Sequence, residues 1–231
     1  MISIKDNRHT LTKEDIAKGY DAIVEHVGLE PRFYDDCIRM HSGYFGSILD
    51  VGCGRGFLLK KLSEKSEPGT KFFGIDISPK LVEIAKSNNP EATLEIGDAE
   101  KMRFADATFD FVFMTEALEH MQDFSKSLSE VMRVLKPGGI FIVTIPNRDW
   151  ASYDFYDKIR NHSLQPIDDH YFRYSEITGL LKDQNFKILR EKGLDNLYYY
   201  GWKHKLEEFA AYFMPFLNRK MKRLIFKCRK D

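Results

Sequence analysis

Ile48-Leu49-Asp50-Val51-Gly52-Cys53-Gly54-Arg55-Gly56 runs from an apolar segment of strand length into a glycine-rich turn, and residues 57–62 then open a helix. Glycines let the backbone approach a ligand closely, and the amino end of a helix favours negative groups. In open α/β sheets this turn lies beside the topological switch point, where ligands bind. The stretch therefore predicts an α/β fold with a ligand site at this turn.

The next predicted strand ends at Gly74-Ile75-Asp76, roughly twenty residues beyond Gly56. That is the distance at which such folds place an acid on a ribose, whose two hydroxyls can donate to one carboxylate. A ribonucleoside-containing ligand is implied. Dinucleotide enzymes use the same geometry, although Phe57 stands where their fingerprint has its last glycine.

Strand-length apolar runs alternate with segments of helical periodicity through the middle of the chain, which is typical of a mostly parallel sheet. Pro137-Gly138-Gly139 predicts a turn before the fifth strand, and Ser175 is the predicted cap of a helix over 175–184. A further helical segment is predicted at 203–217. The predicted strands cover residues 47–51, 71–75, 93–96, 109–114, 140–145, 186–189 and 223–229.

The composition of the 231 residues favours one soluble, cytoplasmic domain. The chain is 43% hydrophobic, and 35 basic residues balance 35 acidic ones, so bulk charge does not favour binding a nucleic acid. The amino terminus is too polar for a signal peptide, and no apolar run approaches the roughly 20 residues of a membrane span. Cys37, Cys53 and Cys228 are far apart without a CxxC pair, which predicts reduced thiols.

Four segments in chain order carry a family resemblance. They are LDVGCGRG at 49–56, GIDISPKLVEIAK at 74–86, GDAEKMRFADATFDFVFMTEALEHM at 97–121 and RVLKPGGIFIVTIPN at 133–147. Together they resemble the core of class I S-adenosylmethionine-dependent methyltransferases, especially the ubiquinone-biosynthesis-like, small-molecule branch. The resemblance implies a Rossmann-like sheet of seven strands with the last antiparallel and helices on both faces. It divides a single domain, 1–231, into a helical cap (1–45), a cofactor-binding core (46–147) and a substrate-side region with strands six and seven (148–231).

By matching position, the resemblance also implies a site for S-adenosylmethionine. Asp50 and the glycine turn would surround its methionine part, Asp76 would hold the ribose, and Asp98 would accept from the adenine amino group. A turn or helix-cap role is the alternative for Asp98, and packing within the cap is the alternative for Tyr20, which would otherwise reach the cofactor carboxylate. The implied cofactor residues are Tyr20, Asp50, Gly52, Cys53, Gly54, Asp76, Ile77, Asp98, Ala99, Thr115 and Glu116.

Two histidines are candidate catalytic bases for a small-molecule acceptor, for which we expect O-methylation. His120 lies four residues after Glu116, which would share a helical face with it and orient the imidazole. His170 lies in the segment 168–174, dense in acidic and aromatic residues, and is the first candidate. The alternative for both is a hydrogen bond to neighbouring loop backbone. No two histidines have the HxxxH spacing, and no metal site is predicted.

The aromatic and basic carboxyl-terminal segment has two interpretations. Residues 198–217 and 219–230 resemble an interfacial anchor for a hydrophobic acceptor, but a substrate lid followed by the seventh strand fits their periodicity better. Peripheral membrane contact is thus possible but not favoured. The sequence identifies neither the acceptor nor the oligomeric state.

Three other functions are alternatives to methyl transfer. A nicotinamide oxidoreductase is the main one, and 199–203 contains a YxxxK, but a glycine inside it argues against the required long helix. A nucleic-acid amino methylase lacks its signature, since the chain reads Met114-Thr115-Glu116-Ala117 after strand four. An inactive cofactor-binding partner subunit is the third alternative.

Overall fold

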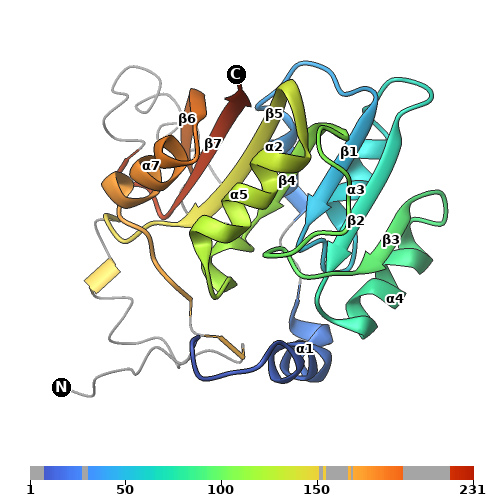
Figure 1. The fold of residues 1–231 in the computed structure, drawn as a ribbon, viewed down its shortest axis with the longest axis horizontal. Coiled ribbons are helices and arrows are strands. Elements are labelled where there is room, and N and C mark those ends of the chain that lie inside the picture. Colours follow the sequence, from blue (N-terminus) through green and yellow to red (C-terminus); the bar gives the residue numbers. More distant parts are fainter. Residues whose placement is uncertain (1–7, 28–30, 151–152, 155–165, 168, 195–218) are drawn as a thin grey trace.

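The computed structural model describes residues 8–27, 31–150, 153–154, 166–167, 169–194 and 219–231. Seven strands form one sheet in the order β3-β2-β1-β4-β5-β7-β6 (Figure 1). Strand β7 runs antiparallel to both of its neighbours, β5 and β6, and the other strand pairs are parallel. The predicted fold class is confirmed. The strands are β1 Ser47–Val51, β2 Lys71–Asp76, β3 Thr93–Ile96, β4 Phe109–Thr115, β5 Leu135–Pro146, β6 Phe186–Leu194 and β7 Arg223–Lys230.

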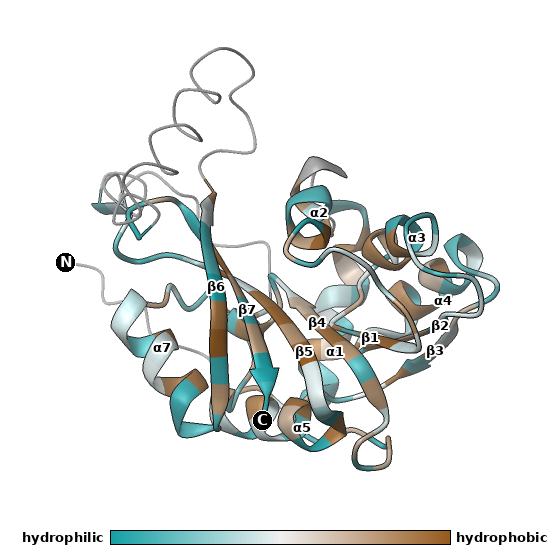
Figure 2. Ribbon diagram, turned by 90° about the horizontal axis from the view of Figure 1, so that it is seen from above, coloured by the Kyte–Doolittle hydropathy of each residue, from teal (hydrophilic) through white to brown (hydrophobic). Residues whose placement is uncertain are grey.

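Both faces of the sheet are buried, and alternate residues of the strands serve the two faces. Ile48 and Phe113 pack in the cluster that includes helix α2 (Pro31–Ile38) and helix α3 (Phe57–Ser63). The adjacent Leu49 and Val112 pack in the cluster that includes helices α5 (Phe124–Val134) and α7 (Tyr174–Asp183). This period of two is what a sheet covered on both sides requires. Figure 2 shows the resulting apolar stretches along β4, β5 and β7.

The strand order reverses between β1 and β4. Ligands of open α/β sheets bind at such a switch point, beside the carboxyl ends of the strands. The chain moves from β1 outward to β2 and β3, then returns to pair β4 with the other edge of β1. Helix α4 (Pro79–Asn88) follows β2. Helix α1 (Lys13–Ala22) lies below the carboxyl ends of the strands (Figure 1), and the short turn η1 (Val24–His26) follows it. The described part of the predicted cap, residues 1–45, is helical.

Two local predictions are wrong. Strand β5 begins at Leu135, before the predicted turn at 137–139, because Leu135 already pairs with Phe109 across an irregularity in the register. Helix α7 begins after Arg173, not at a Ser175 cap. Its first N–H groups are taken by acids: Tyr174 N donates to Asp149 Oδ2 at 2.8 Å.

Other predictions lie partly or wholly outside the described residues. The helix predicted at 203–217 and the YxxxK at 199–203 belong to that group.

Cys37, Cys53 and Cys228 are buried and form no disulfide. Within the described ranges, no helix combines the length and apolar character that a membrane crossing requires. The division into a single domain stays a prediction.

Asn147 joins the end of β5 to the segment that leads into β7. Its fully buried side chain donates to the carbonyl oxygens of Arg219 (3.0 Å) and Met221 (2.7 Å), and its Oδ1 accepts from Asp149 N (3.0 Å). The two donated bonds hold the segment that leads into β7, and the accepted bond holds the loop after β5.

Asn147→Ala should lower the free energy of unfolding by about 1 to 3 kcal/mol, because buried carbonyl groups lose their donors. Urea denaturation measures this, with Glu83→Ala on the exposed face of α4 as the control. A loss no larger than that of the control would contradict the role of Asn147.

Candidate active site

A cavity of about 410 Å³ lies at the carboxyl ends of the strands. Residues that follow β1, β2 and β3 line one half, and residues at the ends of β4 and β5 and the start of β7 line the other. Helix α1 contributes Lys13, Ile16 and Tyr20 to the wall. The cavity thus spans the switch point.

The glycine turn is shaped by positive φ angles. Gly52 (φ +72°) and Gly54 (φ +51°) occupy the left-handed region, which glycine adopts without strain. Gly52 N donates to Ile75 O at 2.9 Å, and a Cβ at Gly52 would lie 2.7 Å from the Cβ of Ala117. Gly54 N donates to Asp76 Oδ2 at 2.9 Å. The turn after β1 is therefore fixed to the end of β2.

Two buried carboxyl groups face each other across this turn. Asp76 Oδ1 also accepts from Ser78 N at 2.9 Å; burial raises the pKa of Asp76, and the N–H groups of Ser78 and Gly54 oppose that shift. Burial and the nearby Asp76 raise the pKa of Asp50 to about 8. Asp50 Oδ1 has no hydrogen-bond partner in the described part of the chain. An amino-acid ammonium can supply a donor to Asp50 Oδ1, and the Asp76 oxygens can accept from ribose hydroxyls in addition to the backbone N–H groups. The residues present therefore fit S-adenosylmethionine.

The side of the cavity that the resemblance implies for adenine is bounded by Ile77, Asp98 and Ala99. Asp98 Oδ1 accepts from Glu100 N at 3.0 Å and from Lys13 Nζ at 3.2 Å. Asp98 thus lines the cavity and also organises the turn after β3, so both interpretations of this residue find support. Lys13 brings α1 to the edge of the site.

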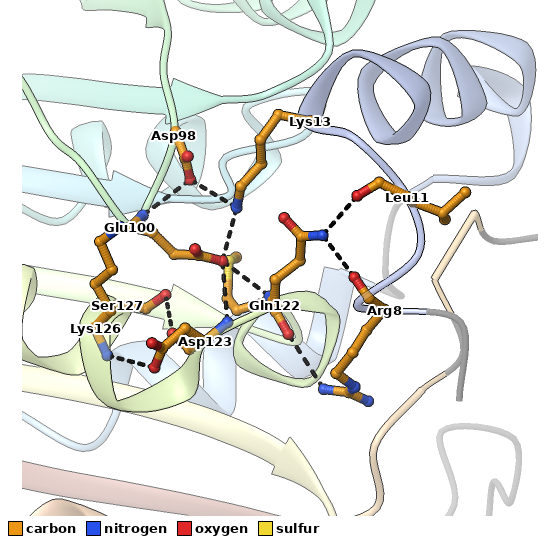
Figure 3. A network of polar contacts seen from close by, with 10 residues as sticks. Arg8, Leu11, Lys13, Asp98, Glu100, Gln122, Asp123, Lys126 and Ser127 are labelled. Carbon is orange, nitrogen blue, oxygen red and sulfur yellow. Dashed lines mark hydrogen bonds and ion pairs between the residues drawn. The ribbon is translucent and has the colours of Figure 1, made fainter. Parts of the chain in front are cut away.

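Glu100 connects three segments around this edge (Figure 3). Its buried Oε1 lies 2.7 Å from Lys13 Nζ and accepts from Gln122 N (2.9 Å) and Asp123 N (3.1 Å). The Gln122 side chain in turn donates to Leu11 O at 2.8 Å. The amino-terminal segment is therefore held against the loop before α5 by polar contacts, and it closes the cavity from below.

The other half of the cavity contains a buried ion pair that the sequence did not indicate. Glu116 has a positive φ of +48°, which is strained for a residue with a side chain. Its N–H donates to Thr144 Oγ1 at 2.8 Å, and its carboxylate accepts from that hydroxyl and from Arg223 Nε at the start of β7. The last strand thus holds the end of β4 in its strained conformation.

His120 lines the same half of the cavity, at the end of the short turn η2 (Leu118–His120). Glu116 precedes this turn and does not share a helix with His120, so that expected pairing is wrong. Asp169 is the acid beside the imidazole, with 3.4 Å between Oδ1 and Nδ1. Burial lowers the pKa of His120 to about 4, although the charge of Glu116 opposes this, so the ring is neutral at neutral pH.

His170 lies elsewhere. Its Nε2 is 2.7 Å from Glu176 Oε1, and its ring packs on Phe124 and Phe172. It lines a second, separate depression with Arg8 and Gln122. Its catalytic role stays a prediction, but the geometry does not bring it to the main cavity.

All eleven residues implied for the cofactor line the main cavity together with His120. Asp169 and Tyr171 line it as well, and they belong to the segment 168–174 that the sequence singled out for His170. Sequence reasoning missed Arg223, Glu119 and Lys13, which also line the cavity. For Arg223 a signal existed, because it begins a predicted strand that must end beside β5, and Glu119 precedes the candidate His120 directly. The position of Lys13 depends on how the cap packs, which no local pattern reveals.

Asp76→Ala should weaken S-adenosylmethionine binding by about 1 to 3 kcal/mol, because the ribose hydroxyls lose a charged acceptor. Calorimetric titration measures this, and Glu91→Ala, an exposed change before β3, is the control. Unchanged affinity in a folded Asp76→Ala protein would remove Asp76 from the site.

Comparison with known proteins agrees with this geometry. A family model described as a methyltransferase domain matches residues 49–143. Demethylmenaquinone methyltransferase of Symbiobacterium thermophilum is 34% identical over 149 residues, 61% of this chain and 59% of that protein. Ubiquinone/menaquinone biosynthesis C-methyltransferase UbiE of Geobacter sulfurreducens is 33% identical over 140 residues, 56% of this chain and 54% of that protein. The chain spans a little over half the length of each of these relatives.

A solved structure extends the likeness to the whole fold. A methyltransferase from Thermotoga maritima, described as a possible histamine N-methyltransferase, superposes with a TM-score of 0.69 at 20% identity and covers 94% of this chain and all of that one. By sequence, residues 49–143 of this chain therefore match a methyltransferase domain. The chain as described also shares the fold of a solved S-adenosylmethionine-dependent methyltransferase.

Proposed function

We propose that this protein transfers the methyl group of S-adenosylmethionine to a hydroxyl group of a small-molecule acceptor in the cytoplasm. One observation carries the proposal. A single cavity joins the residues implied for the cofactor to a second half that contains His120, Asp169 and Tyr171. A cofactor in the first half would lie beside an acceptor in the second, which is the arrangement that a direct transfer needs.

The chain's own residues would align the partners and exclude water. When bound, S-adenosylmethionine supplies an electrophilic methyl group on a sulfonium. Asp76, Asp50 and the glycine turn would hold the nucleoside and amino-acid parts, and α1, held by Lys13 and Gln122, would cover them. Much of the rate of such a transfer comes from alignment in a water-excluded site.

His120 would accept the proton that leaves the hydroxyl group. A neutral imidazole has one nitrogen free to accept, and Asp169 beside Nδ1 would hold the ring so that Nε2 performs this role. Asp169 would also favour the imidazolium that forms. His170 does not line the cavity, so we assign this step to His120.

Methylation of carbon is the second candidate. The Geobacter relative is named as a C-methyltransferase of quinone biosynthesis. A hydroxylated ring would suit this reaction as well, because an ionised ring hydroxyl activates neighbouring carbon atoms. His120 would take a proton in both cases, so the two reactions differ in the atom that is alkylated.

Calorimetry with S-adenosylmethionine and with NAD separates the proposed enzyme from an oxidoreductase. We expect binding of S-adenosylmethionine alone. Incubation with methyl-labelled cofactor and a fractionated metabolite pool should then give a labelled small molecule, in which NMR locates the methyl on oxygen or carbon. Cofactor binding without transfer to any fraction would favour the inactive partner subunit, and binding of NAD alone would overturn the assignment.

His120→Ala should reduce turnover by roughly 10²-fold or more while cofactor affinity stays nearly unchanged. His170→Ala is the matched variant, and we expect it to lower the melting temperature with little loss of turnover per folded molecule. Burial lowers the pKa of His120 to about 4, so the imidazole stays in its basic form at mildly acidic pH. The pH at which kcat drops to half on the acid side should therefore lie well below 6.5, the pKa of an unperturbed histidine. If His170→Ala instead lost most of its turnover and His120→Ala kept it, the catalytic role would belong to His170.

A further inference from the structure

The half of the cavity over β4, β5 and β7 has a chemical character of its own. We call it the acceptor half and define it by six lining residues: Glu116, Glu119, His120, Asp169, Tyr171 and Arg223. None of them follows β1, β2 or β3, where the residues implied for the nucleoside lie. Apart from Glu116, which is implied for the cofactor as well, the acceptor half consists of residues outside the set implied for the cofactor.

This half is built on fixed backbone. Phe172 N donates to Pro146 O at 3.1 Å, and Arg148 N donates to Phe172 O at 2.8 Å, so the segment around Phe172 lies along the end of β5. His170 N donates to Glu119 O at 3.3 Å, which joins the same segment to η2. The positions of Asp169 and Tyr171 are thereby tied to the sheet.

The positive charge in the acceptor half is already used. Arg223 is the only one of the six lining residues with a permanently charged cation, and its Nε bonds to Glu116. The side chains of Arg223 and Glu116 are only 19% and 11% exposed. An incoming anion at this guanidinium would lie beside the Glu116 carboxylate, and drawing Arg223 away would cost Glu116 its ion-pair partner.

Proton acceptors dominate what remains. Glu119 and Asp169 flank the His120 ring, with 4.0 Å from Glu119 Oε1 to Nε2 and 3.4 Å from Asp169 Oδ1 to Nδ1. The Glu119 side chain is 3% exposed, and its Oε2 has no hydrogen-bond partner in the described part of the chain. A buried carboxyl oxygen without a partner is costly, and a donor on a bound molecule would remove that cost.

We propose that Glu119, His120 and Asp169 form a subsite that binds the hydroxyl groups of an uncharged acceptor and excludes acceptors that carry a carboxylate or phosphate there. This proposal rests on the proposed function and specifies its substrate class. A hydroxyl can donate to Asp169 and to the imidazole, and it can also accept from Glu119, because burial raises the pKa of that carboxyl. A carboxylate can only accept, so Asp169 and the acceptor nitrogen of His120 would face further lone pairs. The discrimination is strong in a buried site because the mismatched polar groups stay unpaired.

Three small probes test the subsite directly: 4-methylcatechol, 4-methylbenzoate and 4-methylbenzylamine. Each carries the same methyl-substituted benzene ring, and they differ in the polar group, which is hydroxyl, carboxylate or ammonium. Their binding to the protein saturated with S-adenosylhomocysteine is measured by ligand-observed NMR titration, which needs no turnover. We expect 4-methylcatechol to bind at least about tenfold more tightly than 4-methylbenzoate. Equal or tighter binding of 4-methylbenzoate overturns the proposal, and a clear preference for 4-methylbenzylamine overturns its restriction to uncharged acceptors.

Two variants locate the effect. Asp169→Asn adds an amide donor at nearly constant volume and should reduce the preference for 4-methylcatechol by about tenfold, whereas Glu119→Met should weaken 4-methylcatechol itself by about fivefold or more. Asp154→Asn, outside the cavity and with an exposed side chain, is the control and should leave both affinities unchanged. Unaltered probe binding in both folded variants overturns the assignment of these residues.

The titration with S-adenosylhomocysteine comes first and separates the two levels of inference. If the protein does not bind it, the proposed function fails before any probe is added. If it binds and the probes do not discriminate, only the subsite proposal fails. Should either variant fail to fold, the three probes on the unaltered protein still decide the question.

Discussion

The hydrogen bond from Gly54 N to Asp76 Oδ2 is the interaction on which the rest of the site depends. It joins the turn after β1 to the end of β2, and so fixes the distance between the amino end of α3 and the carboxylate implied for the ribose. The bond exists only because Gly54 and Gly52 adopt positive φ angles, which bring backbone N–H groups toward β2. Asp50 is buried beside Asp76 as a consequence, and both carboxyl groups acquire pKa values raised by burial.

The sequence allowed prediction of this half of the molecule because its information is local. The three features that indicate it lie within about thirty residues: the apolar run, the glycine spacing and the acid at the end of the next strand. They indicate a strand, a tight turn after it, and the carboxyl end of the neighbouring strand. Five of the seven strands were predicted to within one residue at each end for the same reason. Strand β6 continues to Leu194, beyond its predicted end at 189. The exceptions are instructive. Strand β5 begins earlier than the turn at 137–139 indicated because pairing with β4 decides its start, and α7 is capped by Asp149 from another loop.

The acceptor half was far less predictable because its contacts join distant segments. Arg223 reaches Glu116 across more than a hundred residues of sequence, and Asp169 meets His120 through a loop whose course depends on Pro146 and Phe172. A family motif records what all members share, namely the cofactor. Of the residues proposed to face the acceptor, Glu116, Glu119 and His120 lie within the family segment 97–121. The others, Asp169, Tyr171 and Arg223, come from the loop after β5 and the last strand, which the four family segments do not cover.

The position of β7 between β5 and β6 has a consequence for the order in which the protein is made. Strand β6 is synthesised before β7 but pairs with the sheet only through it. On the ribosome, β1 to β5 precede both, so the nucleoside half has all its strands while the acceptor half still lacks Arg223. During that interval Glu116 has no guanidinium partner to support its strained backbone. The last strand to emerge is thus the one that completes the ion pair beside the proposed acceptor subsite.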